Sequence, residues 1–254
     1  MPRLHPGVFL LILSLYVALH QPAMGQQADA PGQRSKLTAE QVVENLVQMN
    51  QERAHALRAY EATRVYRLEY RGFPGARDAE MVVSIKYRSP ATKEFTVVSS
   101  SGSKLLINRV FKKLLESEQE AFESRKHTAI NAENYDFTLA GFEESPSGSF
   151  YVLGVKPKTK NKFLFEGRIW VDAQAFAVAR IEAQPSKNPS FWIKDTKIEE
   201  VNMKVNDFWL PAHNHSVTSV RLGGHADFTI EYKDYQITDA TPLDKLRSVA
   251  QTSK

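Results

Sequence analysis

The stretch that follows Asn134 constrains the fold most, because it consists almost entirely of strand-like segments joined by short turns. Alternating apolar and polar residues predict strands over 134–142, 149–156, 162–171, 176–183, 191–205, 208–221 and 226–237. Turn residues occupy the connections, as at Pro146-Ser147-Gly148, Asn206-Asp207 and Gly223-Gly224. Short turns between consecutive strands require antiparallel pairing, and without helices between the strands a parallel α/β fold is excluded.

The first half of the chain adds two helices and three strands. Thr38 and Gln41 fit a capping box, and apolar residues recur at helical spacing as far as about Leu57. Alternation over 60–71, broken only at Arg64 and Val65, predicts a half-buried strand, and residues 81–87 and 93–100 predict two more. A second amphipathic helix is expected over 103–125, with its charges exposed to solvent, including Glu116, Glu118, Glu120 and Glu123.

These elements predict a mainly β (α+β) fold: a curled antiparallel half-barrel of about ten strands, with an N-terminal helix and a helical lid. A helix is about 10 Å wide and strands lie about 4.8 Å apart, so two helices cover this sheet only if it curls around them. The space beneath the lid is then either an apolar cavity or filled with side chains. We expect one domain over 38–240, a disordered lead at 26–37 and a flexible tail at 241–254.

Residues 1–25 have the layout of a secretory signal peptide. A basic start with Arg3 precedes the apolar run Val8–Leu19, and Ala23-Met24-Gly25 supplies small residues for cleavage after Gly25. The run is shorter than the roughly 20 residues that span a bilayer as a helix, which disfavours the alternative of an uncleaved anchor. We therefore predict a periplasmic protein with no membrane-spanning segment in the mature chain.

The composition excludes several classes of site and partner. The chain has no cysteine, so it has no disulfide, thiolate metal site, cysteine nucleophile or lipid-modified cysteine. Its formal net charge is +4, and its basic residues are interspersed with acidic ones. We therefore expect no nucleic-acid partner, while the charge remains compatible with a weak attraction to anionic lipid surfaces.

No group of residues has the pattern of a catalytic or metal site. The serine-rich stretch 99–103 contains no G-x-S-x-G turn, so a hydrolase would lack a recognisable nucleophile and base. His213 and His215 share a strand face, but a two-residue glycine turn would place His215 opposite Tyr232 and leave His225 too distant to share a metal ion. We predict no enzyme activity, no metal and no cofactor.

Aromatic residues are the best candidates for binding. Phe163 and Phe165 share a strand face with Ile169, and the pairs Phe191-Trp192 and Phe208-Trp209 each place one ring on either face. The alternative for each residue is ordinary packing in the core.

Several short motifs carry a resemblance to a known family. They are Lys86-Tyr87-Arg88-Ser89-Pro90, Gly167-Arg168-Ile169-Trp170-Val171-Asp172, Val178-Ala179-Arg180-Ile181-Glu182 and Asp207-Phe208-Trp209-Leu210-Pro211. From about Thr38 to Ala240 the chain resembles the LolA-like superfamily of outer-membrane lipoprotein-sorting proteins, which includes periplasmic lipoprotein carriers and a regulator. The resemblance implies a half-barrel closed by helices, with an apolar interior that accepts the acyl chains of a lipoprotein or a free lipid. The candidate lining residues are then Tyr66, Leu68, Val83, Ile85, Phe95, Phe163, Phe165, Ile169, Trp192 and Trp209.

The chain departs from the carriers at one position. Carriers of this type have an arginine directly before the proline that follows the second strand, and here that position is Ser89. The nearest arginine, Arg88, is displaced by one residue, which on a strand turns a side chain to the other face, and it is the candidate gate. The expected function is lipid or lipoprotein binding, including outer-membrane lipoprotein sorting. The alternative is an envelope regulator or scaffold that senses lipoproteins and contacts a protein partner.

Overall fold

The computed structural model describes residues 37–90, 92–123, 127–188, 193–221 and 223–243. The predicted signal peptide and its cleavage site lie outside these residues, as do Trp192, the lead up to residue 36 and the tail from residue 244. Among the described residues, no helix is long and apolar enough to cross a membrane.

Helix α1 (Ala39–Ala56) forms where the capping box predicts it. The Thr38 hydroxyl accepts a hydrogen bond from the backbone N–H of Gln41, and the Gln41 side chain accepts one from the N–H of Thr38, at 3.3 and 2.9 Å. The helix ends at Leu57, whose extended backbone leads directly into the first strand.

Ten strands form one antiparallel sheet that is not closed into a barrel, which confirms the predicted fold class. Their order is β3-β2-β1-β10-β9-β8-β7-β6-β5-β4, so the last strand in the sequence lies between the first and the ninth. The strands are β1 (Leu57–Gly72), β2 (Arg77–Arg88), β3 (Thr92–Gly102), β4 (Tyr135–Ser145), β5 (Gly148–Pro157), β6 (Phe165–Asp172), β7 (Val178–Pro185), β8 (Ile193–Val205), β9 (Phe208–Val220) and β10 (Gly224–Ala240).

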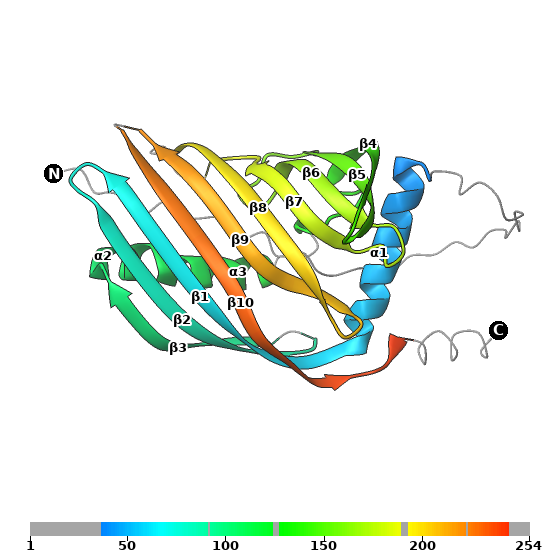
Figure 1. Cartoon of the computed structure of the whole chain (residues 1–254), viewed down its shortest axis with the longest axis horizontal. Coiled ribbons are helices and arrows are strands. Elements are labelled where there is room, and N and C mark those ends of the chain that lie inside the picture. The colour runs from blue at the N-terminus through cyan, green and yellow to red at the C-terminus, as the bar shows by residue number, and fades with distance from the viewer. Residues whose placement is uncertain (1–36, 91, 124–126, 189–192, 222, 244–254) are drawn as a thin grey trace, which may run out of the picture.

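The second predicted helix is present in three parts, called here the lid segment: α2 (Lys104–Leu106), the π-helical turn η1 (Ile107–Phe111) and α3 (Lys112–Glu123). Figure 1 shows the lid segment behind β1, β2 and β10, whereas α1 stands beside the strands from β4 to β7. The two helical elements therefore cover different parts of the same curled sheet.

One face of the sheet, called here the inner face, is defined by a row of residues that pair across consecutive strands. The row runs Tyr66, Ile230, Asn214, Glu200, Ile181, Ile169 and Leu153. Its two ends are apolar, but its middle, on β9 and β8, is polar. Because each residue of the row is buried, this change of polarity lies inside the molecule.

Candidate functional site

An apolar layer, called here the lid layer, fills the space between the lid segment and the sheet. It consists of Tyr66, Leu68, Ala79, Met81, Val83, Ile85, Leu106, Phe111, Leu114, Ala226, Phe228, Ile230 and Tyr232. Phe111 projects from the π-helical turn, and its ring centroid lies 6.0 Å from that of Tyr66 and 6.2 Å from that of Phe228. The inner face of β1, β2 and β10 is thus covered by one helical segment that enters from the open edge at β3.

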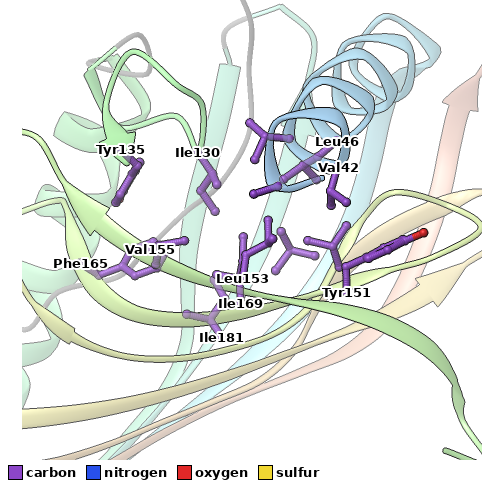
Figure 2. Close-up of a cluster of buried hydrophobic side chains, with 14 of the residues drawn as sticks. Val42, Leu46, Ile130, Tyr135, Tyr151, Leu153, Val155, Phe165, Ile169 and Ile181 are labelled. Atoms are coloured by element: carbon purple, nitrogen blue, oxygen red, sulfur yellow. The ribbon is translucent and has the colours of Figure 1, made fainter. Parts of the chain in front are cut away.

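A second apolar layer lies under α1. Figure 2 shows Val42 and Leu46 of α1 pointing toward Leu153, Ile169 and Ile181 on the sheet. All five side chains have 0% exposure, so this layer is closed core. It fixes α1 on the strands at the β4 side of the sheet.

Polar residues on β8 and β9 separate the two apolar layers. Thr196 and Thr218 form a hydrogen bond of 3.0 Å between their hydroxyl oxygens, and the Asn214 amide donates to Glu200 at 3.4 Å. These four residues are buried on the inner face, as is Ser216. A continuous apolar surface across the whole inner face is therefore interrupted at its centre.

A buried ion triad holds the lid segment to the sheet. Glu118 of α3 accepts from Arg64 of β1 through one carboxylate oxygen and from Lys93 of β3 through the other, at 2.5 Å each. Arg64 also donates to the hydroxyl of Tyr66 at 3.2 Å, and its guanidinium lies 4.7 Å from the ring centroid of Tyr232. The triad therefore joins β1, β3 and α3 at the margin of the lid layer.

The charges of the triad are set by burial and by one another. Burial alone would raise the pKa of Glu118, but Arg64 and Lys93 together lower it to about 2. Burial lowers the pKa of Lys93 to about 8, and Glu118 opposes this shift while Arg64 adds to it. Glu118 raises the pKa of Arg64 well above its ordinary value despite burial. Glu118 is thus held as a carboxylate between two cations.

The pKa of Glu200 is shifted in the opposite direction from that of Glu118. Its pKa is raised to about 8 because burial disfavours its charged form, and neither the hydrogen bond from Asn214 nor the field of Arg64 offsets that cost. At neutral pH this carboxyl is therefore mostly protonated in the folded protein.

The predicted lining residues divide between the two layers. Tyr66, Leu68, Val83 and Ile85 meet in the lid layer, and the partly buried Phe95 packs at its edge. Phe165 and Ile169 belong instead to the layer under α1. Phe163 is half-buried and precedes β6, although it was expected within that strand. The Asn161 side chain accepts a hydrogen bond from the Phe163 N–H at 3.0 Å and so holds a turn there.

Trp209 lies on the other, outer face of the sheet. Its neighbour Phe208 is buried in a separate inner cluster, and adjacent strand residues point to opposite faces. Trp209 packs against a cluster formed by Phe150, Val152, Trp170 and Ala179. It is therefore not brought together with the predicted lining residues of the two inner layers.

Arg88, the candidate gate, is exposed at the end of β2 and lines a surface cleft with residues of α1, β1 and β10. Tyr87 beside it is buried on the inner face, so Arg88 points away from the lid layer, as its one-residue displacement predicts.

The histidines of β9 do not gather a metal site. His215 lies opposite Thr229 rather than Tyr232, because β9 ends at Val220 and β10 already begins at Gly224, so the chain turns earlier in the sequence than at the predicted Gly223-Gly224. This register brings His215 within 3.1 Å of Asp227, a pair that the predicted register kept apart. Within the described ranges, no three His, Asp or Glu side chains are grouped as metal ligands.

The ion triad was not predicted from the sequence, although one signal for it was present. Arg64 stands where the alternation of β1 breaks, and it occupies an inner position that the pattern assigns to an apolar side chain. Glu118 gave no such signal, since it belongs to a run of glutamates and was expected on the exposed face of the helix. In the structure it has 0% exposure, which corrects that expectation.

No protein-family model and no curated protein sequence matches the chain. A solved structure of a DUF1329 family protein from Desulfovibrio piger is similar to it, with 12% identity, a TM-score of 0.41, and coverage of 84% of this chain and 98% of the other. A LolA superfamily protein from Nitrosomonas europaea is also similar, with 12% identity, a TM-score of 0.36, and coverage of 83% of this chain and 97% of the other. An outer membrane lipoprotein-sorting protein domain from Vibrio parahaemolyticus has 11% identity, a TM-score of 0.40, and coverage of 84% of this chain and 98% of the other. With TM-scores of 0.36–0.41 and identities of 11–12%, these likenesses assign neither a family nor a function to this chain.

Proposed function

We propose that this protein is a periplasmic lipid- or lipoprotein-binding protein, which holds acyl chains between the inner face of its sheet and the lid segment and serves outer-membrane lipoprotein sorting. The observation that carries the proposal is the lid layer. It is an extended apolar surface on β1, β2 and β10, covered by a single helical segment beside an open sheet edge. An acyl chain would replace the contacts of the lid segment with apolar contacts of its own.

The energetics favour such an exchange. Each buried CH₂ group contributes about 0.8 kcal/mol, so a long acyl chain offsets the loss of several side-chain contacts. The π-helical turn η1 supports the same proposal, since such turns occur frequently at functional sites and provide a place where a helix can bend. No catalytic residue is required for this function.

Ala226→Phe tests the proposal directly. Ala226 is a small buried residue of the lid layer on β10, so a phenyl ring there occupies the space that an acyl chain would take. We expect uptake of a fluorescent fatty acid by the full-length mature protein to weaken about tenfold or more, since one lost side-chain-sized contact is worth about 1.5–3 kcal/mol.

The matched control is Val217→Phe, which adds the same ring at a partly exposed position on the outer face of the neighbouring strand. Native mass spectrometry of the wild type, purified from a bacterial periplasm, adds an independent readout through acyl lipid that is released on denaturation. Equal uptake by both variants, or a wild type that takes up no fatty acid and carries no lipid, would contradict the proposal.

The alternative function, an envelope regulator or scaffold, is favoured by a different feature. Strand β3 is a free edge of the sheet, and Val97, Val98 and Leu105 expose 47%, 64% and 47% of their surface beside it. Exposed apolar side chains on an open edge are suited to the addition of a strand from a partner protein.

If β3 binds a partner protein, the double variant Val97→Lys/Val98→Lys should abolish co-purification of that partner and leave fatty-acid uptake unchanged. Leu139→Lys, on the opposite edge strand β4, should leave both unchanged.

A further inference from the structure

A surface cleft of about 660 Å³ lies where α1 ends and β1 begins. Its lining is polar and includes two guanidinium groups, an imidazole, two hydroxyls and one carboxylate. These groups belong to His55, Arg58, Arg88, Ser89, Thr238 and Asp239. The cleft is thus chemically unlike the lid layer and involves none of its residues.

A backbone irregularity brings the cleft residues together. The register of β1 against β10 shifts on both sides of Ala59, which pairs with Arg88 on β2 and with Asp239 on β10. Beside this shift, the backbone carbonyl of Arg58 accepts a hydrogen bond from the N–H of Ser89 at 2.6 Å. Bulges of this kind commonly redirect side chains at functional sites, and here the bulge places Arg58 next to the end of β2.

The two arginines of the cleft differ from Arg67 and Arg71 of the same hairpin. Arg67 and Arg71 each form ion pairs with carboxylates, with Glu80 and Asp78 respectively. In the described part of the chain, neither Arg58 nor Arg88 has a carboxylate within ion-pair distance, and Arg58 donates only to the Thr241 hydroxyl, at 3.1 Å. Among the described residues, two guanidinium groups without an ion-pair partner therefore line one cleft.

We propose that this cleft binds a phosphoryl anion that carries a hydroxyl or amine group. Guanidinium groups hold phosphate through paired, charge-assisted hydrogen bonds, and two of them provide more than one such pair. Ser89 and Thr238 add hydroxyl donors, while Asp239 can accept from the hydroxyl or ammonium group of the ligand. The same chemistry is offered by the headgroup of a phospholipid and by a soluble phosphate ester. The inference goes beyond the proposed function, because it does not depend on the lid layer.

The test compares the wild type with Arg58→Gln/Arg88→Gln in the full-length mature protein. The matched control, Arg77→Gln/Lys197→Gln, removes the same charge from residues of β2 and β8 outside the cleft. Calorimetric titration with glycerol 3-phosphate and with inorganic phosphate measures the affinity for soluble phosphates. Co-sedimentation with phosphatidylglycerol vesicles, compared with phosphatidylcholine vesicles, measures the affinity for a lipid headgroup.

We expect the cleft variant to lose at least tenfold in affinity for the phosphoryl probe that the wild type binds, while the control variant keeps wild-type affinity. A loss of affinity that is confined to the vesicles assigns the site to a lipid headgroup. A loss of affinity for glycerol 3-phosphate assigns it to a soluble ester. Equal affinity of wild type and cleft variant for every probe would overturn the inference, as would an equal loss in the control. Fatty-acid uptake should be unchanged in the single variant Arg58→Gln, which leaves the candidate gate Arg88 in place, so failure here is distinguishable from failure of the acyl-chain proposal.

Discussion

Replacing Glu118 with glutamine is expected to destabilise the folded protein by about 3–5 kcal/mol. The substitution keeps the shape of the side chain but leaves Arg64 and Lys93 buried without a counter-charge, which is costly in a low-dielectric interior. For a chain of this size the loss corresponds to a fall of about 6–20 °C in melting temperature. Urea unfolding followed by circular dichroism measures the free energy of unfolding, and thermal unfolding measures the melting temperature.

Two further variants separate the lost charge from other effects of this substitution. Glu116→Gln changes an exposed carboxylate on the same helix, paired with Lys113, and should stay within about 0.5 kcal/mol of the wild type. Arg64→Met/Lys93→Met/Glu118→Leu removes all three charges and should recover most of the stability, because apolar residues often replace buried ion networks without loss. A Glu118→Gln protein as stable as Glu116→Gln would show that the triad does not hold the lid segment.

Replacing Glu200 with glutamine is expected to stabilise the protein by an amount that grows as pH rises above about 4.5. The pKa of Glu200 is about 8 in the folded protein against an ordinary value of 4.5, so between these values the unfolded chain releases a proton that the folded chain keeps. The stability of the wild type therefore falls as pH rises from about 4.5 to 8 and is constant above that range. One pKa unit corresponds to about 1.4 kcal/mol, so the gain in the variant reaches up to about 5 kcal/mol above pH 8.

Urea unfolding of both proteins at pH 4.5, 6.5 and 8.5 measures this difference. The free energies should agree near pH 4.5 and diverge steadily with rising pH. Glu199→Gln, at the adjacent exposed position on β8, is the matched control and should follow the wild type. A constant difference between wild type and Glu200→Gln across the range would mean that Glu200 is already ionised in the folded state.

The triad changes the stability of the protein with pH in the opposite direction from Glu200. Because Arg64 and Lys93 hold the pKa of Glu118 at about 2, the stability it contributes is complete above about pH 4.5 and is lost as pH falls toward 2. The loss of stability at acid pH should therefore be smaller in the apolar triple variant than in the wild type.

The fold could be predicted wherever one local signal dominated. The capping box at Thr38 fixed the start of α1, and uninterrupted alternation placed the strands within a few residues of their observed bounds. Errors arose where a side chain or a turn replaced the periodic pattern. Asn161 delayed the start of β6, and a turn that comes earlier than Gly223-Gly224 moved His215 by three positions in its register.

The site was harder to predict, for a physical reason. Alternation reports which face of a strand is buried, but it does not report which helix covers that face. Tyr66 and Ile169 share the inner face, yet they pack under different helices. Likewise, burial of Glu118 depends on contacts with β1 and β3, which lie far from it in sequence.

The order of the strands also determines when the molecule can become complete during its synthesis. β1 pairs with β10, so that Leu68 lies opposite Phe228, and the hairpins before and after this pair are local. The three N-terminal strands thus cannot join the other half until the chain has emerged almost to its end. A chain arranged in this way stays incompletely folded while it is being made, and its final cooperative folding step awaits its last strand.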